Sequence, residues 1–279
     1  MRTIPIPTAH LFPVADQLLI SLLRSLEEKD WQRPTLARLW TVKDVAAHLL
    51  DGNMRVIALY RDHYFGEKPS GIHSYADLVH YLNQLNAGWV QASRRLSPAL
   101  LTDLLENTGN TYSQLMAQQD PFADAVFSVA WAGEQTSPNW FHIAREFTEK
   151  MHHQLQIREA VGQTDPLMER SLFYPFIYTL LKGLPHAYRD QPAPDHTIIS
   201  IEVTGPSGGH WQLLHQDQQW QLLEGNGNGT PAAGISIPAA IAWKLFTKGL
   251  SPAEALPQVQ LSGNEAMAKV ALSMIAVMA

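Results

Sequence analysis

Residues 137–162 read SPNWFHIAREFTEKMHHQLQIREAVG, and this stretch decides how the first two-thirds of the chain is interpreted. Its ends carry residues that begin and end helices. Ser137 is the expected N-cap, Pro138 suits the first turn, and Gly162 suits the position just after the last turn. The sequence therefore predicts one long helix over residues 139–161.

This helix offers a metal several pairs of ligands. Glu149 and His153 are four residues apart, so their side chains lie on one face and can both reach one ion. His142 and Glu146 have the same spacing. His152 lies three residues from Glu149 but about 100° round the helix from His153, so the two histidines cannot point equally well at the same ion. The spacing alone leaves these registers open.

A third ligand has to come from another helix. His48 lies within LWTVKDVAAHLLDGN, residues 39–53, where Thr41 and Asp44 have the spacing of a capping box. A helix is predicted to begin there and to run to Gly66. A single histidine on such a helix is most often a hydrogen-bonded core residue. Joined to a carboxylate and a second imidazole, it would complete the three-ligand site typical of catalytic metals.

The remaining helices follow from apolar residues at helical spacing. They are predicted at residues 10–28 and 74–96, as a shorter piece after Pro98, and at residues 172–184. Pro175 should kink the last of these helices or mark its true start.

The pattern changes after RDQPAPDH, residues 189–196, which reads as a polar, proline-rich linker. Apolar and polar residues alternate over residues 199–204, the spacing of a strand. The elements expected after that strand are a hairpin (210–216 and 219–224), a loop (225–229), a strand (232–237) and two helices (237–249 and 264–279). We predict an α+β protein of two domains, a helical domain over residues 1–188 and a small α+β domain over residues 197–279.

The composition excludes several classes of function. The chain has 279 residues, a net charge of −6 and no cysteine. Disulfides, thiolate zinc sites and a cysteine nucleophile are therefore excluded, and the negative charge argues against nucleic acid as a partner. No apolar run is long enough for a membrane span, and the N-terminus lacks the apolar core of a signal peptide. A cytoplasmic location is expected.

Two stretches carry a resemblance to a known family. Residues 39–53 resemble the second helix of the DinB/YfiT-like metalloenzyme superfamily, and residues 145–162 resemble the metal-binding helix of its mycothiol-dependent maleylpyruvate isomerase branch. The C-terminal part, with its W-x-L-L strands and the stretch AWKLFTKG, is similar to the sterol-carrier-like domain of that branch. The resemblance implies a DinB-like up-down four-helix bundle followed by a sterol-carrier-like α+β domain.

The resemblance also implies a metal site. In that branch a histidine of the second helix joins a Glu-x-x-x-His pair around a zinc ion, which corresponds here to His48, Glu149 and His153. The expected cofactors are a divalent metal, with zinc first, and a low-molecular-weight thiol. The ligand types alone would also accept nickel, iron or manganese.

Four charged residues are candidates for supporting roles. Arg145 lies one turn before Glu149 and Asp51 one turn after His48, so both are candidate catalytic residues that orient the ligands, although each also fits a solvated charge. The C-terminal domain of the branch supplies an arginine near the active site. The last arginine here is Arg189, so the candidate cofactor-binding cations are Lys244 and Lys248.

Three functions remain open from the sequence. The first is an isomerase or S-transferase that binds a small-molecule substrate and a thiol at the metal. The second is metal-assisted hydrolysis at the same site. The third is a non-enzymatic protein with a vestigial metal site that binds an apolar ligand, in which Trp211, Trp220 and Trp243 would line the cavity instead of packing in the core.

Overall fold

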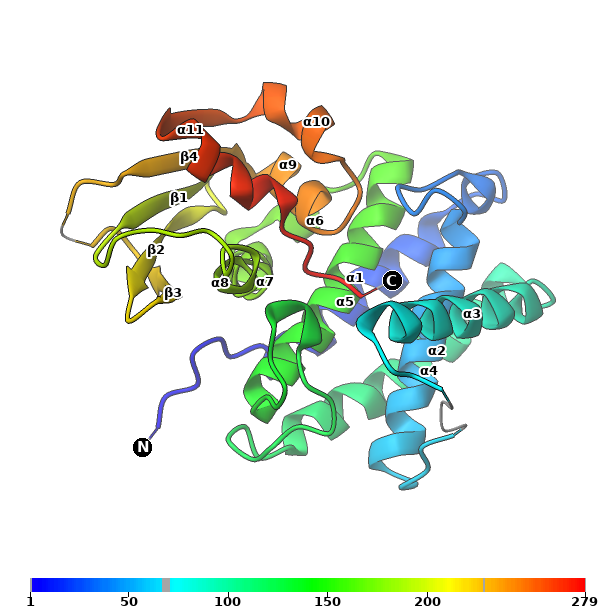
Figure 1. Cartoon of the computed structure of the whole chain (residues 1–279). Helices are drawn as coiled ribbons and strands as arrows, with labels where there is room; N and C mark the ends of the chain where they lie inside the picture. Colours follow the sequence, from blue (N-terminus) through cyan, green and yellow to red (C-terminus); the bar gives the residue numbers. More distant parts are fainter. Residues whose placement is uncertain (1, 67–70, 228, 279) are drawn as a thin grey trace. The chain divides into compact units, whose positions relative to one another are not determined.

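The computed structural model describes residues 2–66, 71–227 and 229–278 (Figure 1). The chain divides into two compact units, each built from segments that are distant in sequence. The unit that we call the helical unit consists mainly of Pro7–Asp120 and Glu149–Leu167. The unit that we call the sheet unit consists mainly of Pro121–Thr148 and Met168–Val277. The predicted domain boundary within residues 189–196 stays a prediction.

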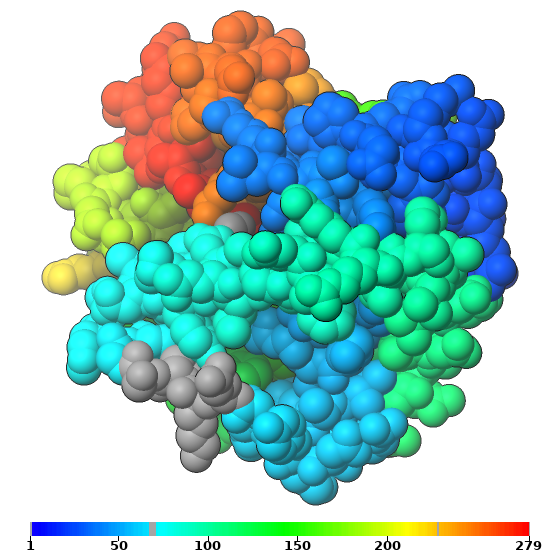
Figure 2. Space-filling model, turned by 90° about the vertical axis from the view of Figure 1, so that its right-hand side faces the viewer, coloured from blue at the N-terminus to red at the C-terminus, as the bar shows by residue number. Residues whose placement is uncertain are grey.

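Amphipathic helices form the helical unit. They are α1 (Phe12–Ser25), α2 (Val42–Tyr60), α3 (Tyr75–Ser93), α4 (Pro98–Gln118) and the second half of α5 (Asn139–Val161). Both α1 and α2 pack against α4, and α3 packs against α2. Figure 2 shows α3, in cyan, lying across the surface of this unit. The core joins Leu23, Val45, Leu101 and Ile157, which come from four different helices and are almost fully buried.

The predicted start of α2 is confirmed. The Thr41 hydroxyl accepts a hydrogen bond from the Asp44 amide at 3.3 Å, and the Asp44 carboxylate accepts one from the Thr41 amide at 3.0 Å. This reciprocal capping box satisfies two amides that the helix itself leaves unpaired. The helix ends at Tyr60, before the predicted Gly66.

The short helix predicted after Pro98 is wrong in length, because α4 runs for 21 residues. Gly109 lies inside this helix, where it makes room for a neighbour, since a Cβ at this position would lie 2.8 Å from Oδ2 of Asp16.

Helix α5 has the predicted bounds, and Gly162 follows it with a φ of +73°, the left-handed conformation that ends many helices. The predicted cap at Ser137 is wrong. The amides of Asn139 and Trp140 donate to the carbonyls of Ala123 and Pro121, so the preceding loop satisfies the first turn. The Ser137 hydroxyl accepts instead from the amide of Val129.

A five-stranded sheet with the order β3-β2-β1-β4-β5 forms the centre of the sheet unit. The strands are β1 (Ile198–Thr204), β2 (Gly209–Gln216), β3 (Gln219–Glu224), β4 (Ala233–Pro238) and β5 (Gln260–Gly263). β1 and β4 pair in parallel, and the other neighbours pair antiparallel. The predicted hairpin is confirmed, and its turn places Asp217 and Gln218 at φ values of 51° and 59°.

Short helices complete the sheet unit. They are α6 (Asp165–Met168), which begins in the helical unit, α7 (Arg170–Leu181), α8 (Leu184–Ala187), α9 (Ala239–Phe246), α10 (Pro252–Ala255) and α11 (Glu265–Lys269). α9 and α11 pack against β4, and α8 packs against β3. Pro175 lies inside α7 and does not mark its start.

Two predictions for the C-terminal region need correction. The helix predicted over residues 264–279 ends at Lys269 and continues only as a 3₁₀ turn, because the amide of Ala276 bonds the carbonyl of Phe246 at 2.9 Å. β5 was not predicted. The three tryptophans considered as cavity walls are buried, with Trp211 at 0 %, Trp220 at 6 % and Trp243 at 1 % exposure. This burial favours core packing.

The chain is thus a mixed α+β protein in which a helical N-terminal region precedes a five-stranded sheet. No helix among the described residues is both long and apolar enough to cross a bilayer.

Candidate metal centre

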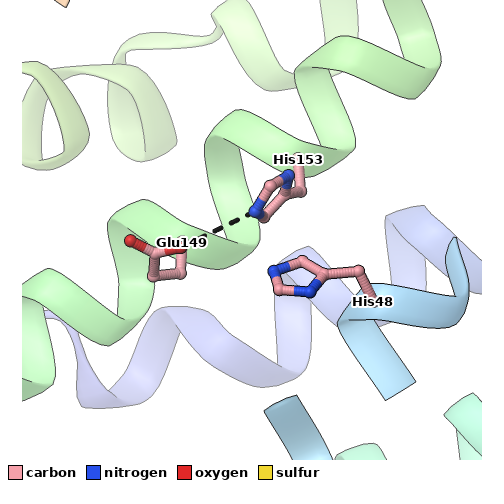
Figure 3. Close-up of side chains that lie close together, drawn as sticks. All are labelled: His48, Glu149 and His153. Carbon is pink, nitrogen blue, oxygen red and sulfur yellow. Dashed lines mark ion pairs between the residues drawn. The ribbon is translucent and has the colours of Figure 1, made fainter. Parts of the chain in front are cut away.

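His48, Glu149 and His153 lie together within the helical unit (Figure 3). His48 comes from the middle of α2, and the other two come from α5. Each residue offers one ligand atom, and these atoms lie within 4.8 Å of one another. Nε2 of His153 is 3.6 Å from Oε2 of Glu149. Two nitrogens and one oxygen therefore converge on a space of the size that a metal ion occupies.

Packing brings the two helices together at this point. Ala46 and Ala47 on α2 and Ile157 on α5 belong to one buried apolar cluster. The Trp89 indole donates to the carbonyl of Ala47 at 2.8 Å, which holds α3 beside the turn that carries His48. The centroid of the Trp40 ring lies 5.0 Å from that of the His48 ring. The site thus has an apolar wall on this side.

Gln156 orients the ring of His153. Its Oε1 lies 2.9 Å from Nδ1 of His153. Because an amide oxygen only accepts, Nδ1 carries the proton and Nε2 keeps a free lone pair for a metal. The sequence analysis missed Gln156. A polar residue on the buried face of the helix, three positions after a candidate ligand, was the signal that could have found it.

His48 is suited to metal binding in its neutral form. Burial, followed by the proximity of His153, lowers the pKa of His48 well below its usual value. Its Nδ1 is buried without a hydrogen-bond partner among the described residues. Neutral imidazoles and a carboxylate are the donors that zinc and its neighbours in the transition series accept. The three residues present therefore fit a divalent metal.

Glu149 is more exposed to solvent than His153. The side chain of Glu149 is 27 % exposed, whereas that of His153 is 10 % exposed. Three protein ligands leave further coordination positions open. These open positions are where a small molecule would bind.

The alternative ligand pairs do not form a comparable group. Nε2 of His142 lies 4.0 Å from Oε1 of Glu146, but among the described residues only His48, Glu149 and His153 gather three such ligands. Burial lowers the pKa of His142 to about 4.

The two predicted supporting residues have partners on their own helices. Arg145 donates to Oε1 of Glu146 at 2.5 Å and lies 3.0 Å from Nδ1 of His142. Asp51 forms an ion pair with Arg55 at 3.7 Å, and burial raises the pKa of Asp51. The catalytic roles of Arg145 and Asp51 stay predictions.

Lys244 and Lys248 belong to the sheet unit. Nζ of Lys244 lies 5.6 Å from the centroid of the Trp243 ring, and burial lowers the pKa of Lys248. Their assignment as cofactor-binding cations stays a prediction. A cavity of about 530 Å³ in the sheet unit is lined by residues such as Arg170 and Glu224, and none of the predicted site residues contributes to it.

Two solved structures are similar to this chain. One is a crystal structure of the mycothiol-dependent maleylpyruvate isomerase, with 14 % identity, and the other is a histidine-to-alanine mutant of the mycothiol-dependent maleylpyruvate isomerase, with 13 % identity. Each match covers 94 % of this chain and 96 % of the other, with a TM-score of 0.54. At this identity the likeness shows the fold. No curated protein sequence matches the chain.

The family model for the mycothiol maleylpyruvate isomerase N-terminal domain matches residues 12–158, which is more than half of the chain. The matched range contains the helix of His48 and the helix of Glu149 and His153. It confirms the resemblance inferred from residues 39–53 and 145–162. On this match and on the shared fold, the chain belongs to the mycothiol maleylpyruvate isomerase N-terminal domain family.

Proposed function

We propose that this protein is a thiol-dependent isomerase of a small unsaturated acid, with a divalent metal held by His48, Glu149 and His153. The observation that carries the proposal is the convergence of these three ligands within 4.8 Å, in a chain of this family. Zinc is the first choice of metal. The finer features of the family, a DinB-like four-helix bundle, a sterol-carrier-like second domain and a cytoplasmic location, belong to the same proposal.

The residues around the site have distinct roles in this scheme. A metal bound here would favour the thiolate form of a coordinated thiol. His48 and His153 supply neutral nitrogens, and Gln156 keeps the proton of His153 on Nδ1. The Trp40 ring packs against His48, with the two ring centroids 5.0 Å apart. In a cis–trans isomerisation, thiolate addition turns the double bond into a single bond that can rotate. Elimination then restores the double bond and releases the thiol unchanged.

The test is an isomerisation assay with maleylpyruvate as substrate. Mycothiol, bacillithiol and glutathione are each compared with a reaction that contains no thiol. We expect turnover with at least one thiol, none without, and loss of turnover in His48→Ala. Ester or amide hydrolysis that is indifferent to all three thiols, with no isomerisation, would contradict the proposal and indicate a metal-assisted hydrolase.

A further inference from the structure

A buried ammonium group joins four helices of the helical unit. Lys150 follows Glu149 on α5, and its side chain is 9 % exposed. Nζ of Lys150 donates to Oδ1 of Asp16 on α1 at 2.7 Å and to Oδ1 of Asn53 on α2 at 2.9 Å. The same atom lies 4.2 Å from the centroid of the Tyr112 ring on α4. One side chain of α5 therefore contacts all three of these helices.

The partners of Lys150 are themselves held in place. Nδ2 of Asn53 donates to the Thr108 hydroxyl at 3.0 Å. The second oxygen of Asp16 approaches α4 at Gly109, where a Cβ would come within 2.8 Å of it. Glycine is unfavourable inside a helix, and here it leaves space for the carboxylate. Asp16 thus accepts from Lys150 with one carboxylate oxygen and lies against α4 with the other.

Such a network defines geometry more than it adds stability. A buried ion pair repays little more than the cost of removing its charges from water, and its best-attested use is to fix the register of packed helices. Lys150 points about 100° away from Glu149 round α5, and Asn53 lies five residues after His48, about 140° round α2. The hydrogen bond between Lys150 and Asn53 thus ties together the two helices that carry the ligands, on faces that the ligands do not occupy.

We propose that Lys150 is a positioning residue for the metal site, which acts through Asn53 and Asp16. Its hydrogen bonds set the rotation and the height of α5 against α2, so that Glu149 and His153 meet His48. Lys150 itself does not touch the metal. This inference rests on the proposed metal site.

The test compares zinc affinity with thermal stability in four variants. Lys150→Met and Asn53→Leu each remove the hydrogen bond that links α5 to α2. The double variant removes the same hydrogen bond, so its effect on zinc affinity should not exceed that of either single variant. Arg158→Met is the matched control, because Arg158 is a buried cation of the same helix whose hydrogen bonds go to the carbonyls of Leu18 and Gln163. Zinc affinity is measured by competition with a chelator, well below each melting temperature.

We expect zinc affinity to fall at least 10-fold in Lys150→Met and in Asn53→Leu, and no further in the double variant. Arg158→Met should lower the melting temperature and leave zinc affinity within about 2-fold of wild type. If Lys150→Met does not fold, the zinc affinity of Asn53→Leu alone tests the positioning role. Wild-type affinity in the folded variants would overturn the positioning role and leave the metal site standing. A wild-type protein that binds no zinc would overturn both.

Discussion

At the scale of single residues, the contact between Gln156 and His153 has a measurable consequence. Replacing Gln156 with Leu removes the acceptor for Nδ1 of His153, so its ring loses both its orientation and its tautomer. We expect zinc affinity to fall about 10- to 100-fold. Isothermal titration would measure it. Gln156→Glu keeps an acceptor and should stay close to wild type. Wild-type affinity in Gln156→Leu would show that the contact does not support metal binding.

His142 should make stability dependent on pH. Its pKa is about 4 in the folded protein, against the usual 6.5. Since the folded pKa is depressed, the unfolded chain binds the proton first, and stability present above pH 6.5 is lost as the pH falls towards 4. The loss attributable to His142 is about 3 kcal/mol between pH 7 and pH 4.

Urea unfolding of wild type and His142→Gln over this pH range checks the prediction. The variant should show a flatter dependence on pH. Parallel curves would mean that His142 does not titrate as its burial implies.

Residue spacing identified the candidate ligands only in part. Glu149 and His153 share their spacing with His142 and Glu146, and the sequence could not decide which pair faces another helix. That choice depends on how α5 is rotated when it packs, which is a tertiary property. The resemblance to the family selected the pair that the structure brings to His48.

At the scale of elements, two glycines inside helices should respond in opposite ways to alanine. Gly109→Ala in α4 places a Cβ 2.8 Å from Asp16, whereas Gly88→Ala in α3 meets nothing within 4 Å. The first should lower the free energy of unfolding by about 1–3 kcal/mol through overpacking. The second should raise it by up to about 1 kcal/mol through helix propensity. Denaturant titrations of both variants measure this. Stabilisation by Gly109→Ala would contradict the tight packing seen at Asp16.

Local signals were sufficient where an element carries its own caps. The capping box at Thr41 and the stop at Gly162 define ends of α2 and α5 without help from the rest of the fold. Local signals failed where a residue distant in the sequence determines the end of a helix. Ala276 leaves the predicted C-terminal helix, and its amide bonds the carbonyl of Phe246 on α9.

At the scale of the whole molecule, the candidate ligand set is brought together only in the folded chain. Its members come from segments that are about 100 residues apart, and packing of the helical unit brings them together. Zinc should therefore stabilise the folded state by mass action and raise the melting temperature. At a free zinc concentration 100 times the dissociation constant, the free energy of unfolding should rise by about 2.7 kcal/mol. Differential scanning calorimetry with and without zinc checks this. His48→Ala should show no shift, and an equal shift in that variant would place the zinc elsewhere.

The residue pattern changes from helical to strand spacing across the polar, proline-rich residues 189–196, and the first strand begins at Ile198. It could not show that α5 divides between two compact units, because a continuous helix carries no local sign of which core each half joins. The mixed α+β class followed from periodicity. The partition of the chain follows from long-range packing.

The most direct test of the metal site is the zinc stoichiometry of three proteins, measured by equilibrium dialysis and elemental analysis. We predict one zinc per chain in wild type, one in His142→Ala, and almost none in His48→Ala. Retention of zinc by His48→Ala together with its loss from His142→Ala would contradict the account, because the metal would then lie at the other register of α5.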